Sequence, residues 1–410
     1  MKTIKVPLYT VILLFSLNWS VNAQWSQTTI PTGFDVRSFS SMGTNLFVGT
    51  YGGGVLLTTN NGINWTAVNN GLTNPLVNSL ISVGSDIYAG TYTGGVFKSV
   101  NNGANWSVVN NGLTSLLVQS SCLMGSNLFV STATGGVFFT NNGGSNWNQV
   151  IGGLPMLNVT SLCVMGTNIF AGTVGGVYLS TNNGTNWSNT NVILNNKSTW
   201  GMAVIGSNLF AATYDYANGG GVYYTSNNGV NWNSINGSIP THYTKTLCVS
   251  GNNIFVGTAS GVYLSTDNGA SWINKNQGIN NNDTVNTLFI ANSYIFAGIS
   301  HRFAWKRTLT EALDVRNLST EIPNEYTLSQ NYPNPFNPTT NINYKLPKDG
   351  FIKLVVYDAL GREMETLVNE KQTAGTYEAT FDASKLTSGI YFYRLTAENF
   401  SETKKMLLIK

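Results

Sequence analysis

Seven tryptophans recur along the chain at nearly constant intervals of 40, 41, 41, 40, 45 and 40 residues: Trp25, Trp65, Trp106, Trp147, Trp187, Trp232 and Trp272. A period of about 40 residues is the length that one four-stranded propeller blade needs. The spacing therefore predicts an all-β chain whose larger part is a β-propeller. A repeat of this kind explains how the core is buried, and it says much less about function.

The segment from Val77 to Trp106 shows what one repeat contains. Val77–Val83 and Asp86–Thr91 alternate apolar and polar residues, as half-buried strands do, and Val96–Ser99 predicts a third strand. Asn101-Asn102-Gly103 follows, and these residue types tolerate the positive φ of a tight turn. The tryptophan then opens a fourth strand. Few charges and Gly-rich turns suit sheets that pack face to face.

The two ends of the repeat region predict how the ring closes. Trp25 has no such turn before it, and Val285–Leu309 supplies three strand-like pieces with no tryptophan of the series after them. We therefore expect Trp25–Ile30 to form the fourth strand of the last blade. This arrangement gives seven complete blades within residues 24–310 and removes an exposed sheet edge.

Charge divides the chain near residue 310. Residues 24–310 contain five Lys, three Arg, five Asp and no Glu, whereas residues 311–410 contain eleven Lys or Arg and thirteen Asp or Glu. This change in charge density predicts a domain boundary, with a polar linker over residues 311–325. Neither part has the basic stripe that phosphate neutralisation requires, so we expect no binding of nucleic acid.

The first 23 residues have the pattern of a signal peptide. Lys2 and Lys5 precede the mostly apolar stretch Val6–Leu17, and Val21-Asn22-Ala23 places small residues before a cleavage site at Gln24. The apolar stretch is shorter than the roughly 20 residues that a membrane-spanning helix needs. We therefore expect secretion and no transmembrane segment in the mature chain.

No cofactor or metal is expected from the sequence. The three cysteines, Cys122, Cys163 and Cys248, each lie three residues before a repeat glycine, so they occupy one position in three different blades. This placement predicts small buried residues on inner strands rather than a disulfide framework or a metal cluster. The chain also lacks a P-loop, a zinc-spacing motif and a nucleophile elbow.

The turns before six of the tryptophans share the pattern S/T-x-N/D-x-G-x-x-W. They are Thr58–Trp65, Ser99–Trp106, Thr140–Trp147, Ser180–Trp187, Thr225–Trp232 and Ser265–Trp272. The pattern resembles the Asp-box (BNR) repeat of sialidase-like, sortilin-like and photosystem-assembly-factor-like propellers. Only the copy with Asp267 carries the Asp of that family. The short polar side chain can cap its own turn, so we interpret the motif as structural. In the families that it resembles, the box lies on the face away from the ligand site.

The last 85 residues resemble the type A C-terminal sorting domain of the type IX secretion system. The matching motifs are NYPNPFNPTT at Asn331–Thr340, VYDALGRE at Val356–Glu363, AGTYEATFD at Ala374–Asp382, LTSGIYFYRL at Leu386–Leu395 and KKMLLIK at Lys404–Lys410. Short alternating segments predict a small Ig-like β-sandwich over residues 326–410. The resemblance implies a sorting signal that includes Lys404, Lys405 and Lys410. It also implies the secretion machinery as a partner, with Sec export, outer-membrane passage and a released or surface-attached product. The alternative is an Ig-like binding module without an address role.

The resemblance to sialidases raises the question of catalysis, and the residues do not favour it. That chemistry needs an arginine cluster and a Tyr/Glu pair, but residues 24–310 hold only Arg37, Arg302 and Arg307 and no Glu. A glycosidase needs two facing carboxyl groups about 5–10 Å apart. Asp35, Asp215 and Asp283 lie in or near loops on the expected ligand face, and a pair among them stays open as an alternative.

Loops after the second and fourth strands should line the face opposite the box turns. They contribute ten candidate binding residues: Tyr51, Tyr92, Trp200, Tyr214, Asp215, Tyr216, His242, Tyr243, His301 and Arg302. The loop at Tyr214–Gly221 is the one that lengthens the fifth interval, and a lengthened loop on a rigid scaffold is a common place for function. We therefore expect non-enzymatic binding of a glycan or a surface protein. The alternatives are a polysaccharide-active glycosidase and a mainly structural surface-layer component.

Overall fold

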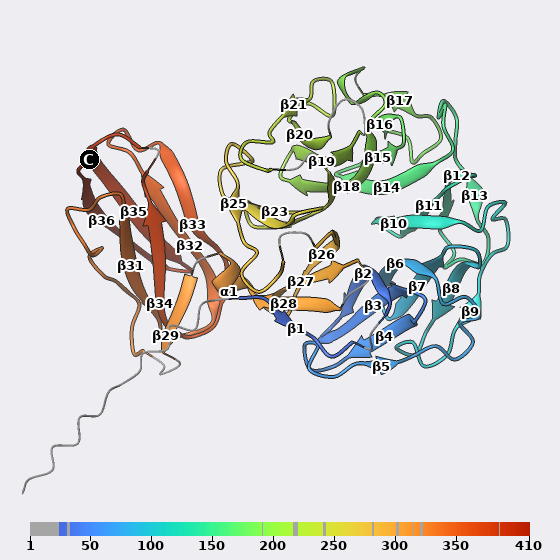
Figure 1. Cartoon of the computed structure of the whole chain (residues 1–410), viewed down its shortest axis with the longest axis horizontal. Coiled ribbons are helices and arrows are strands. Elements are labelled where there is room, and N and C mark those ends of the chain that lie inside the picture. The colour runs from blue at the N-terminus through green and yellow to red at the C-terminus, as the bar shows by residue number, and fades with distance from the viewer. Residues whose placement is uncertain are drawn as a thin grey trace, which may run out of the picture.

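The computed structural model describes residues 24–30, 33–190, 192–215, 220–240, 243–280, 283–300, 303–313, 315–319, 323–384 and 386–410. The expected signal peptide, residues 1–23, lies outside them. Figure 1 shows a ring of small sheets around a common centre, in blue to orange, and a separate β-module in orange to red. The all-β propeller class expected from the tryptophan period is confirmed.

Before residue 309 the described strands form seven four-stranded sheets. The strands nearest the centre of the ring are β2 (Asp35–Met42), β6 (Val77–Val83), β10 (Val118–Met124), β14 (Val159–Met165), β18 (Ser198–Ile205), β22 (Thr244–Ser250) and β26 (Val285–Ala291). The second strands are β3 (Asn45–Tyr51), β7 (Asp86–Thr91), β11 (Asn127–Thr132), β15 (Asn168–Thr173), β19 (Asn208–Tyr214), β23 (Asn253–Thr258) and β27 (Tyr294–Ile299).

The outer half of each sheet is shorter. The third strands are β4 (Gly54–Thr58), β8 (Gly95–Ser99), β12 (Gly136–Thr140), β16 (Gly176–Ser180), β20 (Gly221–Thr225), β24 (Gly261–Ser265) and β28 (Ala304–Thr308). The fourth strands have two residues each: β5 (Thr66–Ala67), β9 (Ser107–Val108), β13 (Asn148–Gln149), β17 (Ser188–Asn189), β21 (Asn233–Ser234), β25 (Ile273–Asn274) and β1 (Ser26–Gln27). A 3-10 helix, η1 (Val192–Leu194), follows β17.

The N-terminal segment closes the ring as expected. Strand β1 lies antiparallel to β28, with Ser26 opposite Lys306 and Gln27 opposite Trp305, so the last sheet runs β1-β28-β27-β26. The first inner strand, β2, also contacts the last one, β26. Strands from the two ends of the propeller region therefore share one sheet, and β1 covers the outer edge of β28.

The tryptophans of the repeat pack between neighbouring sheets. Six of the seven are buried, and Trp65 is half-buried. The indole N–H of Trp106 donates to the carbonyl of Val68 in the preceding sheet at 2.7 Å, and Trp147 bonds Val109 in the same way. The other four buried rings also have an acceptor for their indole N–H, whereas the N–H of Trp65 has none among the described residues. The six buried rings therefore bring apolar area and a satisfied N–H to the seams between sheets.

The three cysteines occupy one position of β10, β14 and β22, as expected, and all are free. Their residues are half-buried rather than buried. Burial of the thiol raises the pKa of Cys163 to about 12. A thiol of this kind stays protonated at neutral pH and acts as a small apolar side chain.

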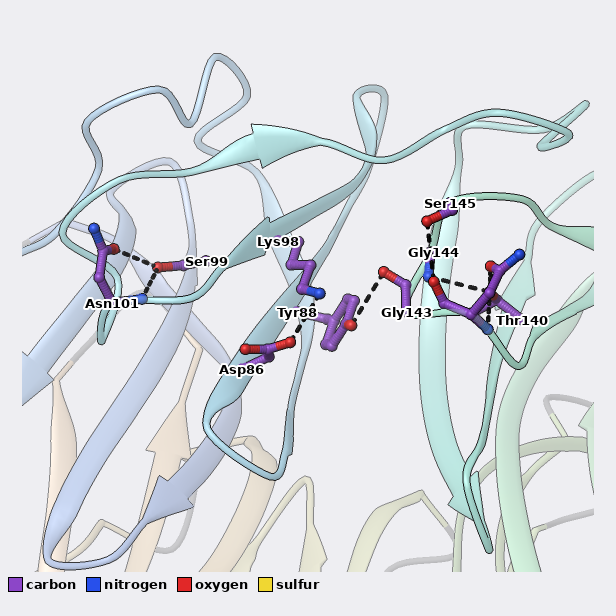
Figure 2. A network of polar contacts seen from close by, with 10 residues as sticks. Asp86, Tyr88, Lys98, Ser99, Asn101, Thr140, Gly143, Gly144 and Ser145 are labelled. Atoms are coloured by element: carbon purple, nitrogen blue, oxygen red, sulfur yellow. Dashed lines mark hydrogen bonds and ion pairs between the residues drawn. The ribbon is translucent and has the colours of Figure 1, made fainter.

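The turns between third and fourth strands share one hydrogen-bond pattern, drawn for two of them in Figure 2. The Ser99 hydroxyl donates to Asn101 Oδ1 at 3.0 Å and accepts from the backbone N–H of Gly103 at 2.9 Å. Asn101 Oδ1 also accepts from the backbone N–H of Asn105 at 2.9 Å. Asn102 has a φ of 56°, in the left-handed region that Asn tolerates better than most residues.

The one Asp of this series makes the same bonds. Asp267 Oδ1 accepts from the Ser265 hydroxyl and from the backbone N–H of Ser271, each at 2.8 Å. In both kinds of turn one side-chain oxygen at this position accepts from the Ser hydroxyl and from the backbone N–H four residues on. The amide oxygen of Asn therefore replaces this carboxylate oxygen in five copies, while the second oxygen of Asp267 accepts one more bond, from the Ser271 hydroxyl at 2.6 Å.

The end of the sheets that carries these turns, which we call the box rim, also links neighbouring sheets. Tyr88 on β7 donates its hydroxyl to the carbonyl of Gly143 in the next turn at 3.2 Å (Figure 2). Lys98 lies over the Tyr88 ring and pairs with Asp86 at 2.8 Å, and this bond to Asp86 raises the pKa of the lysine. These groups therefore serve contacts within and between sheets.

The C-terminal module is a sandwich of two four-stranded sheets (Figure 1). One sheet contains β29 (Val315–Ser319), β34 (Gly375–Asp382), β31 (Thr339–Leu346) and β30 (Thr327–Leu328). The other contains β33 (Glu363–Gln372), β32 (Gly350–Tyr357), β35 (Gly389–Ala397) and β36 (Phe400–Leu408). Alternate residues of these strands are buried between the sheets, as the sequence pattern predicts. The finer Ig-like topology stays a prediction.

The expected linker is partly structured. Helix α1 (Leu309–Ala312) is capped by the Thr308 hydroxyl, and its Leu309 and Ala312 are buried in a core that also contains residues of the sandwich. Strand β29 then pairs with β34. Residues 311–325 therefore include the end of a helix and an edge strand of the module. Their polar composition gave no sign of these two elements in the sequence.

Candidate functional site

One cavity lies at the centre of the ring, at the end of the sheets away from the box turns. It has a volume of about 310 Å³ and receives one residue from each of the seven inner strands. These seven are Arg37, Asn78, Gln119, Thr160, Trp200, Lys245 and Asn286, and Tyr51 and Tyr92 complete the wall. We call this cavity the channel mouth.

A β-bulge in every inner strand presents these seven residues. The register of β2 against β3 shifts between Val36 and Ser38, on either side of Arg37, and the same shift recurs in the six other sheets. The residue before each bulge is fully buried between sheets. A bulge leaves the extra residue out of the ladder and turns its side chain away from the usual alternation. Here the extra residue lines the channel mouth.

The bulge position differs from blade to blade although its neighbours repeat. The three-residue sequences are V-R-S, V-N-S, V-Q-S, V-T-S, T-W-G, T-K-T and V-N-T in chain order. The first position is always Val or Thr, and the third is Ser, Thr or Gly. The neighbours thus suit the packing of the sheets, whereas the central residue ranges from Thr to Trp and from neutral to cationic.

Two cations lie on one side of the channel mouth. Arg37 pairs with Asp35 at 2.9 Å, and its guanidinium lies 5.1 Å from the centre of the Tyr51 ring. Lys245 donates to Asn286 Oδ1 at 2.8 Å. Burial and then the charge of Arg37 lower the pKa of Lys245, while Asp35 opposes this effect. The lysine therefore lies in a partly desolvated place close to a second positive charge.

Two buried nitrogens at this side have no hydrogen-bond partner among the described residues. They are Nε of Arg37 and Nδ2 of Asn286. The bond from Lys245 fixes the orientation of the Asn286 amide, because its oxygen must face the ammonium group. Both unpaired groups are therefore N–H donors.

Aromatic rings border the rest of the channel mouth. Trp200 is 40% exposed and Tyr92 is 44% exposed. The rings of Tyr51 and Tyr92 meet edge to face with centres 5.7 Å apart. Trp200 lies on β18 and Tyr92 in the turn after β7, and exposed rings of this kind suit stacking against the apolar face of a sugar or against an apolar side chain.

The structure places the ten predicted binding residues in three groups. Tyr51, Tyr92 and Trp200 line the channel mouth. Tyr214 and Tyr243 pack against each other with ring centres 4.4 Å apart, and Tyr243 lies beneath the Lys245 ammonium; Asp215 pairs with Lys197 at 3.4 Å. Tyr216, His242, His301 and Arg302 lie outside the described residues.

Six of the seven bulge residues were not among the predicted binding residues. The prediction concerned loops, whereas these six lie within strands: Arg37, Asn78, Gln119, Thr160, Lys245 and Asn286. The signal was present, since these residues share one offset in the repeat. Alternation of strand faces, however, would have assigned them to the sheet surface rather than to the channel.

The three carboxylates considered for catalysis are not among the residues that line the channel mouth. Asp35 pairs with Arg37, Asp215 pairs with Lys197, and Asp283 is buried with its backbone N–H bonded to the carbonyl of Asn280. No carboxyl group occurs among the described residues that line the channel mouth. Over the described part of the chain, no cluster of three His, Cys, Asp or Glu side chains could hold a metal ion.

The proposed sorting signal residues lie at the end of the sandwich. Lys404 pairs with Glu402 at 2.9 Å, and Lys410 donates its ammonium to the carbonyl of Ser384. Met406 and Leu408, between them on β36, are fully buried. Asn331 of the Pro-rich motif donates its side-chain amide to Pro333 O and Thr340 Oγ1, so this motif shapes its own loop beside β36.

Comparison with known proteins identifies the C-terminal module. Residues 330–410 match the family described as the secretion system C-terminal sorting domain, which confirms the predicted sorting domain, while its type A class stays a prediction. No curated protein matches the chain in sequence. Among the helices of the described residues, none has both the length and the apolar character needed to cross a membrane.

Solved structures resemble the chain in fold. A structure described as YCF48 bound to D1 peptide shares 15% identity with a TM-score of 0.55, over 69% of this chain and 96% of that one. The WD40 β-propeller domain of Doa1 shares 12% identity with a TM-score of 0.56, over the same shares of the two chains, 69% and 96%. An ancestral GH74 enzyme shares 16% identity with a TM-score of 0.54, over 93% of this chain and 63% of that one. At these identities the likeness concerns the fold alone.

Proposed function

We propose that the protein is a secreted or surface-attached propeller that binds a glycan at the channel mouth without cleaving it. The observation that carries the proposal is the bulge position, where seven equivalent residues differ while their neighbours repeat. Residues that serve only the repeat have no reason to diverge in this way. A cavity of about 310 Å³ lies at the lower end of the range typical of small-ligand sites.

The chemistry of the wall supports a sugar ligand. The exposed ring of Trp200 offers a stacking surface, and Asn78, Gln119 and Asn286 bring amide groups that can bond hydroxyls. A protein loop could pack against the same rings, so the binding test has to distinguish a protein ligand from a glycan. The glycosidase alternative has no support from the cavity, because its described lining carries no carboxyl group.

We further propose that the repeat is of the Asp-box type, with a propeller over residues 24–310. Six turns with the same bonds and spacing support this assignment. In this scheme the sorting domain directs type IX export after removal of residues 1–23, and the channel mouth acts beyond the outer membrane. The match over residues 330–410 supports the export step.

Binding can be tested with the full chain on a broad glycan array, with the supernatant analysed for released sugars. We expect binding without release, and we expect Trp200→Ala to abolish it. Tyr332→Ala is the matched control, since Tyr332 is an aromatic residue 82% exposed on the sandwich. Equal loss in both variants, or unchanged binding by Trp200→Ala, would contradict the proposed site. Released sugar would favour the glycosidase.

Export can be tested by locating chains altered at the C-terminus. Deletion of residues 404–410 should leave the protein in the periplasm. This deletion also removes the buried Met406 and Leu408, so Lys404→Gln/Lys405→Gln is needed to separate charge from folding. Surface delivery of the deleted chain would argue against the sorting role.

A further inference from the structure

The described lining of the channel mouth carries a net positive charge. Arg37 and Lys245 both contribute to it, and no carboxyl group does. Asp35 pairs with Arg37 from outside the lining and compensates one of the two charges. The remaining charge is that of Lys245, whose charged form is disfavoured by burial and by the charge of Arg37. A bound anionic group would relieve this cost.

The same side of the channel mouth has an excess of hydrogen-bond donors. Arg37 Nε and Asn286 Nδ2 have no acceptor among the described residues, and the ammonium of Lys245 has three N–H bonds of which one goes to Asn286. Buried donors without acceptors are costly, and oxygen atoms of an anion are strong acceptors. The unpaired donors and the positive charge both favour an anionic ligand group with acceptor oxygens.

We propose that the channel mouth selects a glycan that carries a carboxylate, with the acidic group beside Arg37 and Lys245 and a sugar ring stacked on Trp200. The inference rests on the proposed function and names its ligand class. Trp200 and Lys245 come from neighbouring sheets, so one uronic acid residue and the sugar next to it can reach both.

An acidic peptide is the competing ligand, and the wall favours the glycan. A peptide carboxylate would use Arg37 and Lys245 equally well. The amides of Asn78 and Gln119, however, offer further polar partners on the two sheets that follow the sheet of Arg37. A sugar presents hydroxyls all around its ring and can bond such groups while it stacks, whereas an acidic side chain cannot.

The test measures binding of the full chain to polygalacturonate, alginate and hyaluronan, and to the carboxyl-reduced form of each polymer. We expect at least one acidic polymer to bind about tenfold or more tightly than its reduced form, and less tightly as salt rises. Arg37→Gln and Lys245→Gln should each remove most of this preference. Lys98→Gln is the matched control, because Lys98 lies on the box rim and pairs with Asp86.

Three outcomes would overturn the inference, and each has a different consequence for the proposed function. Equal binding of acidic and reduced polymers, lost in Trp200→Ala, would keep the glycan site and exclude charge selection. Binding of poly-glutamate but of no polymer, with the same dependence on Arg37, would replace the glycan by an acidic peptide. Binding of none of these probes and of no glycan on the array would remove both proposals.

Discussion

The box rim and the channel mouth are built from the same repeat, and they differ in what the repeat preserves. At the box rim, six turns keep the same residue types and the same hydrogen bonds, and Asn101 and Asp267 use the same acceptor oxygen. At the channel mouth, seven equivalent positions carry six different residue types. Repetition thus marks the contacts that hold neighbouring sheets together, and divergence marks the surface that is free to bind.

The largest expected loss of stability comes from opening the ring. Deleting residues 24–30 removes β1 and the buried Trp25, whose indole N–H bonds Lys275 O at 2.7 Å. We expect the free energy of unfolding to fall by more than about 4 kcal/mol, since a core tryptophan alone is worth about 3–5 kcal/mol. Thermal unfolding measures this. An unchanged melting temperature would contradict closure by β1.

A pair of tryptophan substitutions compares the two regions directly. Trp106 is 4% exposed at the seam between sheets, so Trp106→Ala should cost about 3–5 kcal/mol of stability. Trp200 stands partly exposed at the channel mouth, so Trp200→Ala should cost less than about 1 kcal/mol. Urea unfolding of both variants measures the difference. Similar losses would mean that Trp200 serves the fold.

The acceptor role of the box residue allows a finer test. Asn101→Ala leaves the Ser99 hydroxyl and the Asn105 N–H without their shared acceptor, and should cost about 1 kcal/mol. Asn101→Asp keeps the oxygen and should change stability by less than about 0.5 kcal/mol. A large loss in the Asp variant would show that the amide nitrogen matters. Denaturant unfolding of the two variants decides this.

The smallest expected effect has the opposite sign. Lys245 has a lowered pKa, so its charged form is disfavoured in the folded protein, and Lys245→Met should add about 0.5 kcal/mol of stability at neutral pH. In the wild type, the free-energy cost of keeping Lys245 charged in the folded protein is fully present below the lowered pKa. This cost disappears as the pH rises towards the ordinary value of 10.5. The gain from Lys245→Met should therefore shrink in alkali. A destabilised variant at pH 7 would mean that the lysine stabilises the fold.

The sequence predicts the fold well and the site only in part. The tryptophan period, the turn motif and the unpaired Trp25 lead to the ring and to its closure, because each of these features follows from packing between sheets. Tyr51, Tyr92 and Trp200 were also found as candidates. Arg37 and Lys245 were not, since strand alternation gives no sign of a bulge that turns a side chain into the channel. Their proximity depends on closure of the whole ring.

The central claim is that the bulge residues bind and do not hold the fold together. The most direct test compares the full chain with the triple variant Arg37→Gln/Trp200→Ala/Lys245→Gln on the glycan array at equal protein concentration. We predict that the wild type binds and that the triple variant loses binding, although it unfolds at the same temperature to within a few degrees. Retained binding, or loss of binding together with loss of the fold, would contradict the account.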